Sequence, residues 1–205
     1  MNFDPLNTFE LKTFRSPSLM NVNDTALMII DVQEKLLPLI AEQQRLQWNI
    51  HRLIRGAQIL GVPMAATEQY PQGLGATVIG LRDALAAAGV VSIPEKTMFS
   101  CRECATLLTE LSERGVTKLV LSGIETHVCV AQTALDLMAA GFNVYLSVDA
   151  VGSRSRLDHD IAIRRLENSG VVPTTTEAIL FEWCEKAGSA AFKKISQLVR
   201  EGTPP

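Results

Sequence analysis

The 205-residue chain is predicted to fold as an α/β protein in which helices cover both faces of a parallel sheet. Short apolar segments alternate with longer segments of helical spacing along the sequence. The short segments are continuously apolar rather than alternating, which is typical of strands buried on both faces. Glycine follows several of the helical segments, where it can end a helix in the left-handed conformation. The length fits one domain.

Six short apolar segments are the predicted strands. They cover residues 26–31, 62–67, 90–94, 118–123, 143–149 and 170–175. The segments between them are long enough to hold crossover helices, so we expect right-handed connections between parallel strands.

Helical periodicity is clearest in 46–60, where apolar residues recur every three or four positions before Gly61. The same pattern predicts helices over 103–114, 130–140 and 157–168 and a last amphipathic helix over 190–202. The last helix has an apolar face that could dock on the sheet or join a partner, formed by Ala191, Phe192, Ile195, Leu198 and Val199. We expect an irregular arm over 1–24 and a single domain over 25–205.

Composition narrows the classes of function. The chain has 19 Lys and Arg against 22 Asp and Glu, a net charge of −3, so no broad basic surface is available for nucleic acid. No segment approaches the roughly 20 apolar residues of a membrane span. The first residues contain charges and prolines where a signal peptide would need a basic start and an uninterrupted apolar core. We therefore expect a cytoplasmic protein with reduced cysteines and no nucleic-acid or membrane partner.

Chemically active side chains follow the predicted strands. Asp31 follows the first strand, Glu95 and Lys96 follow the third, and Cys129 follows the fourth. In open α/β sheets, ligands bind beyond the carboxyl ends of the strands. These positions therefore predict that a carboxylate, an ammonium group and a thiol share one edge of the sheet.

Cys129 lies where a turn meets a predicted helix, and its position alone is equally consistent with a core thiol. A helix start favours the thiolate, and its free N–H groups could bind an oxyanion. Together the residues suit acyl transfer: Asp31 takes the thiol proton, Lys96 stabilises the thiolate, and Cys129 attacks a carbonyl to form a thioester.

Three motifs carry a resemblance to a known family. Asp31 in "DVQEKL", Lys96 in "EKTMFS" and Cys129 in "GIETHVCVAQTALDLMAAGFNVYLSVDA" resemble the Asp–Lys–Cys motifs of the isochorismatase-like cysteine hydrolase superfamily, over about 25–194. Within it, "TEQYPQGLG" and "KTMFSC" are most similar to the isochorismatase-domain-containing branch, whose substrates are mostly unassigned.

The resemblance implies a three-layer Rossmann-like fold with a six-stranded parallel sheet in the order 3-2-1-4-5-6. It also implies a cis peptide between Ile124 and Glu125, an oxyanion hole formed by the N–H groups of Glu125 and Cys129, and a homo-oligomer. Residues that line the substrate pocket are expected to be Gln33, Glu68, Gln69, Tyr70, Phe99 and His127.

Two departures from other superfamily members refine the expectation. Nicotinamidases place an Asp and histidines after the second strand to bind a metal, whereas this chain has "ATEQYPQGLG" there and no histidine between His51 and His127. Isochorismatases proper generally lack the cysteine, so Cys129 favours cleavage of C–N bonds. No G-x-G-x-x-G follows the first strand. We expect a hydrolase of a small amide or related acyl substrate, with no metal and no cofactor.

Two alternatives remain open. Cys101 and Cys104 form a C-x-x-C near a helix start, as in thiol–disulfide oxidoreductases, although a single C-x-x-C is a weak signal. The chain could also be a non-catalytic scaffold of the same fold.

Overall fold

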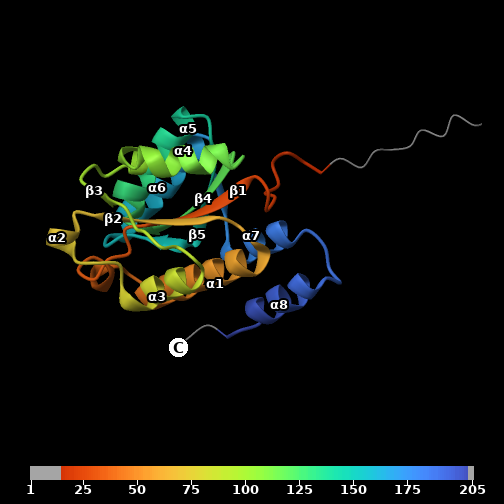
Figure 1. The fold of residues 1–205 in the computed structure, drawn as a ribbon. Helices are drawn as coiled ribbons and strands as arrows, with labels where there is room; N and C mark the ends of the chain where they lie inside the picture. Colours follow the sequence, from red (N-terminus) through yellow and green to blue (C-terminus); the bar gives the residue numbers. More distant parts are fainter. Residues whose placement is uncertain (1–14, 203–205) are drawn as a thin grey trace, which may run out of the picture.

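The computed structural model describes residues 15–202, so 1–14 of the predicted arm and 203–205 of the predicted domain lie outside the described residues. Between Arg15 and Asp24 the chain forms turns. A six-stranded parallel sheet follows in the order β3-β2-β1-β4-β5-β6, as predicted (Figure 1). The strands are β1 Thr25–Ile30, β2 Met64–Gln69, β3 Glu95–Lys96, β4 Lys118–Ile124, β5 Asn143–Gly152 and β6 Val172–Thr174.

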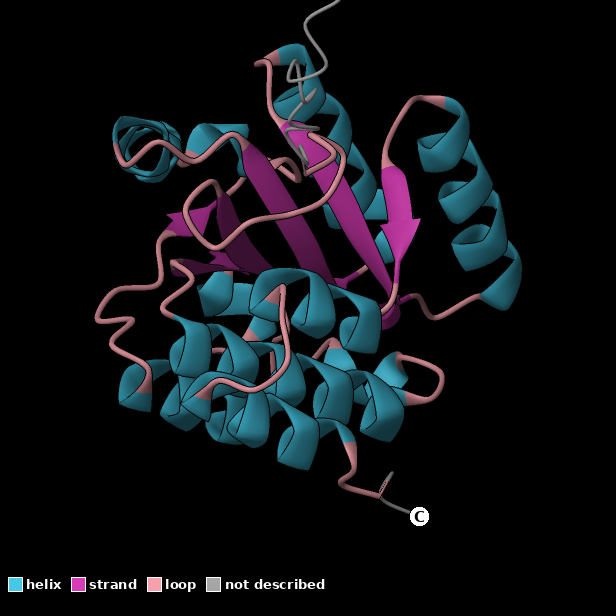
Figure 2. Cartoon of the chain, turned by 90° about the vertical axis from the view of Figure 1, so that its right-hand side faces the viewer, coloured by secondary structure: helices cyan, strands magenta, loops and turns pink. Residues whose placement is uncertain are grey.

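Helices form a layer on each face of the sheet (Figures 1 and 2). One layer contains α1 Gln43–Leu60, α3 Ile79–Ala87, α7 Thr176–Cys184 and α8 Ala190–Val199. The other contains α4 Ala105–Glu113, α5 Ala131–Ala139 and α6 Arg156–Asn168. Short helical turns connect these elements: η1 Leu37–Leu39, α2 Pro71–Leu74, η2 Cys101–Glu103 and η3 Thr126–Val130.

Strand β1 separates two apolar cores. Leu27 and Ile29 belong to the core under α1, whereas Met28 and Ile30 belong to the core under α5. Successive side chains of a strand point to opposite faces, so a strand covered on both sides must be apolar at every position. Burial on both faces explains why the sequence shows continuous apolar segments.

The second and third predicted strands are misplaced. Residues 90–94 form no strand, and Val91 is 99% exposed. Strand β3 is the two-residue pair Glu95–Lys96 at the sheet edge, immediately after Pro94, which has no N–H to donate to a ladder. Lys96 therefore lies in a strand rather than after one. Strand β2 begins two residues later than predicted, so Glu68 and Gln69 also lie inside it.

The last helix docks within the chain. In α8, Ile195 and Leu198 are buried, and α8 packs against α1 and α7. Arg55 of α1 also forms an ion pair with Glu201, at 2.6 Å between Nη1 and Oε2.

Three helices of the structure, α2, α3 and α7, were not predicted from the sequence. No helix in the described part of the chain is long and apolar enough to cross a membrane.

Candidate active site

The predicted catalytic residues lie at the carboxyl end of the sheet. Asp31 directly follows β1, Lys96 ends β3, and Cys129 lies in η3, the turn that follows β4. Strands β1 and β4 are adjacent, and Ile30 pairs with Gly123 next to the site. A Cβ on Gly123 would overlap the Ile30 carbonyl oxygen, so glycine allows the two strand ends to approach closely.

Lys96 and Asp31 form a fully buried ion pair. The Lys96 Nζ lies 2.6 Å from Asp31 Oδ2, and both side chains are 0% exposed. An ion pair with so little solvent is retained only where further hydrogen bonds satisfy the remaining polar atoms. Thr67 supplies one, since its hydroxyl donates to Asp31 Oδ1 at 2.8 Å.

Neutral acceptors surround the Lys96 ammonium group. Its Nζ also donates to Gln69 Oε1 at 2.8 Å and to the carbonyl oxygens of Phe99 at 2.9 Å and Met98 at 3.3 Å. Burial lowers the pKa of Lys96, but the negative charge of Asp31 and the hydrogen bond to it outweigh burial, so the net shift is upward. Lys96 therefore remains a cation.

Cys129 lies in a turn of π-helical geometry between β4 and α5. The peptide between Ile124 and Glu125 is cis, as the resemblance implied. The Glu125 carbonyl accepts the N–H groups of Val128 at 3.0 Å and Val130 at 3.2 Å, which fixes the turn on either side of Cys129. Cys129 is 5% exposed.

The resting state of Cys129 is the thiol. Burial raises the pKa of Cys129 far above its ordinary value, the charge of Asp31 and a hydrogen bond to it raise it further, and Lys96 only partly opposes them. The expected preference for thiolate is therefore wrong. Desolvation and the neighbouring carboxylate outweigh the effect of the helix start.

Three of the predicted pocket residues are hydrogen-bonded in the framework of the site. The Gln33 carboxamide donates to the Gln69 carbonyl at 2.9 Å and to the Gly75 carbonyl at 2.6 Å, and accepts the Gln69 N–H at 2.8 Å. The Gln69 carboxamide accepts a hydrogen bond from Lys96 Nζ and donates one to the Thr97 carbonyl. Glu68 accepts the Thr77 N–H at 2.6 Å. These contacts fix Lys96 and the loop that follows β2.

The other three pocket residues lie nearer to solvent. Tyr70 is 55% exposed and Phe99 is 52% exposed. His127 is partly buried, and its Nδ1 lies 3.0 Å from the hydroxyl of Ser153. A hollow beside the site is lined by residues after β3 and by α5: Met98, Phe99, Ser100, Arg102, Gln132, Leu135 and Asp136.

Sequence reasoning missed Thr67 and Arg154. Thr67 lies inside β2 and contacts Asp31. Arg154 comes two residues after β5, and its Nε lies 3.1 Å from each carboxylate oxygen of Glu125. Arg154 could have been found by the rule that identified Asp31 and Cys129, because it also follows a strand at the carboxyl edge.

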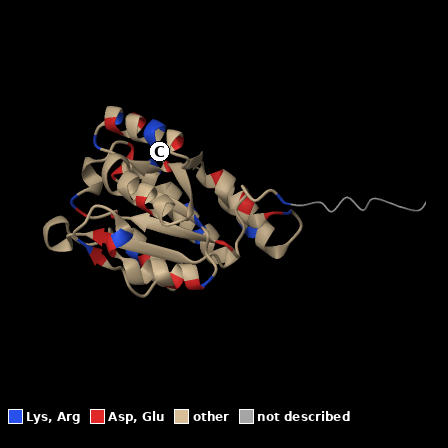
Figure 3. Cartoon of the chain, turned by 90° about the horizontal axis from the view of Figure 1, so that it is seen from above, with Lys and Arg blue, Asp and Glu red and all other residues tan. Residues whose placement is uncertain are grey.

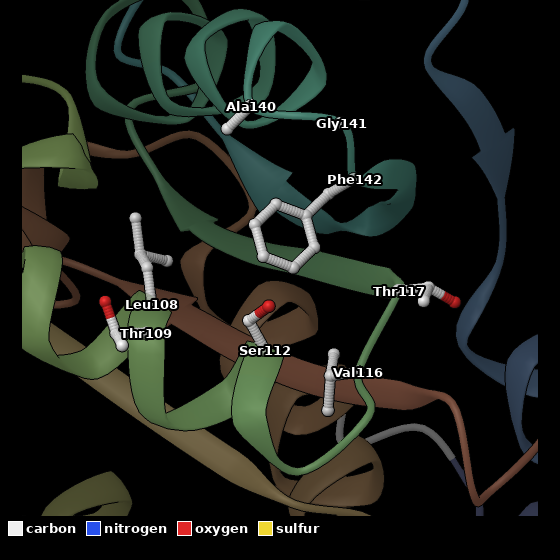
Figure 4. A pocket seen from close by; sticks show the side chains of 8 residues that line it. All are labelled: Leu108, Thr109, Ser112, Val116, Thr117, Ala140, Gly141 and Phe142. Carbon is white, nitrogen blue, oxygen red and sulfur yellow. The ribbon is translucent and has the colours of Figure 1, made fainter.

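A separate hollow lies at the opposite end of the sheet (Figure 4). Its lining includes Thr117 and Phe142, which directly precede β4 and β5. The strands are parallel, so their amino ends lie opposite the edge that holds Asp31 and Cys129. This hollow is therefore not part of the candidate site.

The cysteine pair does not have the exposure expected of a redox dithiol. Cys101 is 0% exposed, Cys104 is 7% exposed, and both are free thiols. Burial, with the charge of Asp31, raises the pKa of Cys101 to about 11. Reactive dithiols require a lowered pKa and an accessible sulfur. Within residues 15–202, no group of three His, Cys, Asp or Glu side chains could hold a metal ion.

Comparison with known proteins identifies relatives. The Isochorismatase domain family matches residues 25–178. Isochorismatase domain-containing protein 1 of Salmo salar is 38% identical over 182 residues, 88% of this chain and 62% of the relative. Protein 2A of Mus musculus is 37% identical over 179 residues, 87% of this chain and 84% of the relative. The chain spans about three fifths of the length of the first curated relatives it matches.

A solved structure is also similar. MAR1 ribonuclease from Caenorhabditis elegans superposes with a TM-score of 0.80 at 36% identity, covering 92% of this chain and 95% of that one.

Proposed function

Because the chain belongs to the isochorismatase family, we propose that it is a cysteine hydrolase of a small amide or related acyl substrate. The observation that carries the proposal is the fully buried Lys96–Asp31 pair, 2.6 Å between Nζ and Oδ2, beside the buried thiol of Cys129, whose pKa the same carboxylate raises. A buried ion pair adds little net stability, so its retention beside a thiol favours a chemical role.

The reaction begins with proton transfer. Asp31 removes the proton of Cys129 as the sulfur attacks the substrate carbonyl, which forms the C–S bond and moves an electron pair onto the carbonyl oxygen. The N–H groups of Glu125 and Cys129 are the proposed oxyanion hole. Lys96 stabilises the negative charge as it moves from the carboxylate, through the attacking sulfur, to the carbonyl oxygen.

Protonated Asp31 then completes the cycle. It gives its proton to the leaving amine as the C–N bond breaks, which leaves a thioester on Cys129. A water molecule, deprotonated by Asp31, attacks the thioester, and Cys129 regains its proton as the acid departs. The proposal requires no metal and no cofactor. It also includes a cytoplasmic location and a homo-oligomer, neither of which the chemistry depends on.

RNA is the second substrate class to test, because the Caenorhabditis elegans relative is a ribonuclease. The net charge of −3 and the interspersed acidic and basic residues favour a small substrate instead. In the view of Figure 3, blue Lys and Arg positions lie among red Asp and Glu positions along the ribbon.

Ammonia release from a panel of small primary amides tests the proposal. For any amide that is turned over, Cys129→Ala is expected to reduce the rate at least about a thousandfold, because it removes the nucleophile. Cys184→Ala, a change at a partly buried cysteine of α7, is the matched control and keeps full activity.

Two outcomes contradict the proposal. One is turnover that survives Cys129→Ala for every substrate. The other is Cys129-dependent degradation of RNA with no amide turned over by the same preparation. A thioester that accumulates on Cys129 and is released by hydroxylamine, seen by mass spectrometry, would support the covalent step.

A further inference from the structure

The C-x-x-C segment has no role in the proposed reaction, yet its first thiol lies beside the site. The Cys101 Sγ lies 3.6 Å from the hydroxyl oxygen of Thr67, and both side chains are buried. The same hydroxyl donates to Asp31 Oδ1 at 2.8 Å. The Cys101 thiol is therefore separated by one hydroxyl group from the carboxylate that the proposed reaction uses as its base.

Backbone contacts hold Thr67 and Cys101 in place. Thr67 lies in β2, and its carbonyl accepts the Asp31 N–H at 3.2 Å. Cys101 begins η2, and its N–H donates to the hydroxyl of Thr133 in α5 at 3.0 Å. Cys101 is thus connected to β2 through its sulfur and to α5 through its backbone.

The direction of the hydrogen bond between Cys101 and Thr67 follows from the charge of Asp31. As the ion-pair partner of Lys96, Asp31 is a carboxylate and can only accept hydrogen bonds. The single hydroxyl hydrogen of Thr67 is therefore used for Asp31, which leaves the Thr67 oxygen to accept the S–H of Cys101. Burial, with the charge of Asp31, raises the pKa of Cys101 to about 11, so this thiol keeps its hydrogen. The resting chain runs from the Cys101 S–H through the Thr67 O–H to Asp31 Oδ1.

The same chain can also run in the opposite direction. In the proposed reaction Asp31 gains the proton of Cys129 and becomes a carboxylic acid, whose O–H needs an acceptor. Lys96 can only donate, whereas the Thr67 hydroxyl can rotate and accept. The hydroxyl hydrogen then points to the sulfur of Cys101, which is a weak acceptor. Rotation of the hydroxyl and thiol hydrogens reverses the chain, and no covalent bond at either residue is broken.

We propose that Thr67 and Cys101 are positioning residues that hold the Asp31 carboxyl group in one orientation while it takes up and releases its proton. The inference rests on the proposed function, because it requires Asp31 to change its protonation state during the reaction. Thr67 is 1% exposed and Cys101 is 0% exposed, so both act through Asp31 rather than on the substrate. The first cysteine of the C-x-x-C segment thereby has a role other than thiol–disulfide exchange.

Alkylation of Cys129 by iodoacetamide tests the proposal without requiring turnover. The sulfur forms a bond to carbon as iodide leaves, and the thiol proton passes to Asp31. The rate at Cys129, measured by peptide mass spectrometry, is divided by the rate at Cys184, which lies outside the site in α7. Thr67→Val keeps the shape but removes the hydroxyl, and it is expected to lower this ratio about tenfold or more, because the carboxyl group is then less often aligned with the thiol. Thr67→Ser keeps the hydroxyl and is expected to stay within about threefold of the wild type.

A double variant tests whether the two residues act as one chain. Cys101→Ala breaks the chain at its far end and is expected to lower the ratio about threefold, the contribution of a weak neutral hydrogen bond. Because Thr67→Val already breaks the chain, adding Cys101→Ala to it is expected to cause no further loss. Cys104→Ala is the matched control, since Cys104 is a buried free thiol of the same segment that is not hydrogen-bonded to Thr67 and caps no helix with its side chain. It leaves the ratio within about twofold of the wild type.

The outcomes separate this proposal from the proposed function. If Thr67→Ser slows Cys129 as much as Thr67→Val does, the hydroxyl is not responsible and the chain is overturned. Additive losses in the double variant, or an equal loss in Cys104→Ala, would overturn the role of Cys101. If Asp31→Asn leaves the alkylation of Cys129 unchanged, the proposed base is wrong and the positioning role fails with it.

Turnover provides a second measurement that a purely structural role would not change in the same way. For any amide that is turned over, Thr67→Val is expected to lower kcat at least about tenfold while KM changes less than about twofold, because the substrate does not contact Thr67. Urea unfolding of the same variants reports the effect on the fold. A loss of stability with kcat unchanged would assign Thr67 to the fold alone and overturn the proposal.

Discussion

Replacing Lys96 with methionine removes the ammonium group and keeps most of the side-chain volume. The change leaves Asp31 as a carboxylate without a cationic partner at 0% exposure, to which the Thr67 hydroxyl still donates at 2.8 Å. It also removes the donor to Gln69 Oε1 and to the Phe99 carbonyl. Methionine adds no polar atom that could replace these contacts.

The expected loss is large because one partner of a buried pair is removed. Breaking such a pair costs about 3–5 kcal/mol of unfolding free energy. For a domain of this length, that loss lowers the Tm by about 6–20 °C. The companion change Asp31→Asn removes the charge that lacks a partner, and asparagine accepts the left-handed φ of 53° at this position. The double variant is therefore expected to recover most of the unfolding free energy that Lys96→Met loses.

Urea unfolding of the wild type, both single variants and the double variant at pH 7 checks the prediction. A stability difference between wild type and Lys96→Met below about 1 kcal/mol would refute the electrostatic reasoning. Failure of Asp31→Asn to restore stability would do the same.

Two further predictions concern packing and thiol reactivity. Gly123→Ala is expected to lower stability by about 3 kcal/mol or more, because its Cβ would lie 2.6 Å from the Ile30 nitrogen at a φ of +115°. Gly115→Ala, at a φ of +81° with open space around it, should cost only about 1 kcal/mol by thermal unfolding, and equal losses would contradict the packing argument. Cys101, with its pKa raised to about 11, is about one part in a thousand thiolate at pH 8. It should resist iodoacetamide until urea unfolds the chain, and rapid labelling of the native protein would show that the site is open.

Much of the fold could be predicted from the sequence because burial leaves a direct trace in composition. Strands β1 and β4 are buried at every position, so their residues are mostly apolar, and Thr25, Lys118 and Ser122 are the exceptions. Strand β3 has only two residues at the sheet edge and leaves almost no such trace. Residues 90–94 are apolar without being a strand, and Val91 is almost fully exposed. Local hydrophobicity therefore could not distinguish the short edge strand from the non-strand segment that precedes it.

The proposed catalytic residues could be placed at one edge of the sheet because that placement depends only on where strands end. Their partners could not, since hydrogen bonding between Gln33 and Gln69, or between Thr67 and Asp31, depends on which side chains meet across neighbouring strands. Carboxamides and hydroxyls occur in many loops and strands. Nothing in the sequence distinguishes one that fixes a lysine from one that faces solvent.

The protonation state of Cys129 shows how a local rule can fail in a buried site. The partial positive charge at a helix start favours the thiolate only weakly, whereas burial disfavours any unpaired charge. The charge of Lys96 is already neutralised by Asp31 at 2.6 Å. A thiolate formed at rest would add a second anion beside one cation. If the proton moves to Asp31 as the sulfur attacks, the carboxylate becomes neutral while negative charge moves to the substrate oxygen. The number of charges beside Lys96 then stays constant through the step, so we expect the proposed reaction to couple proton transfer to attack.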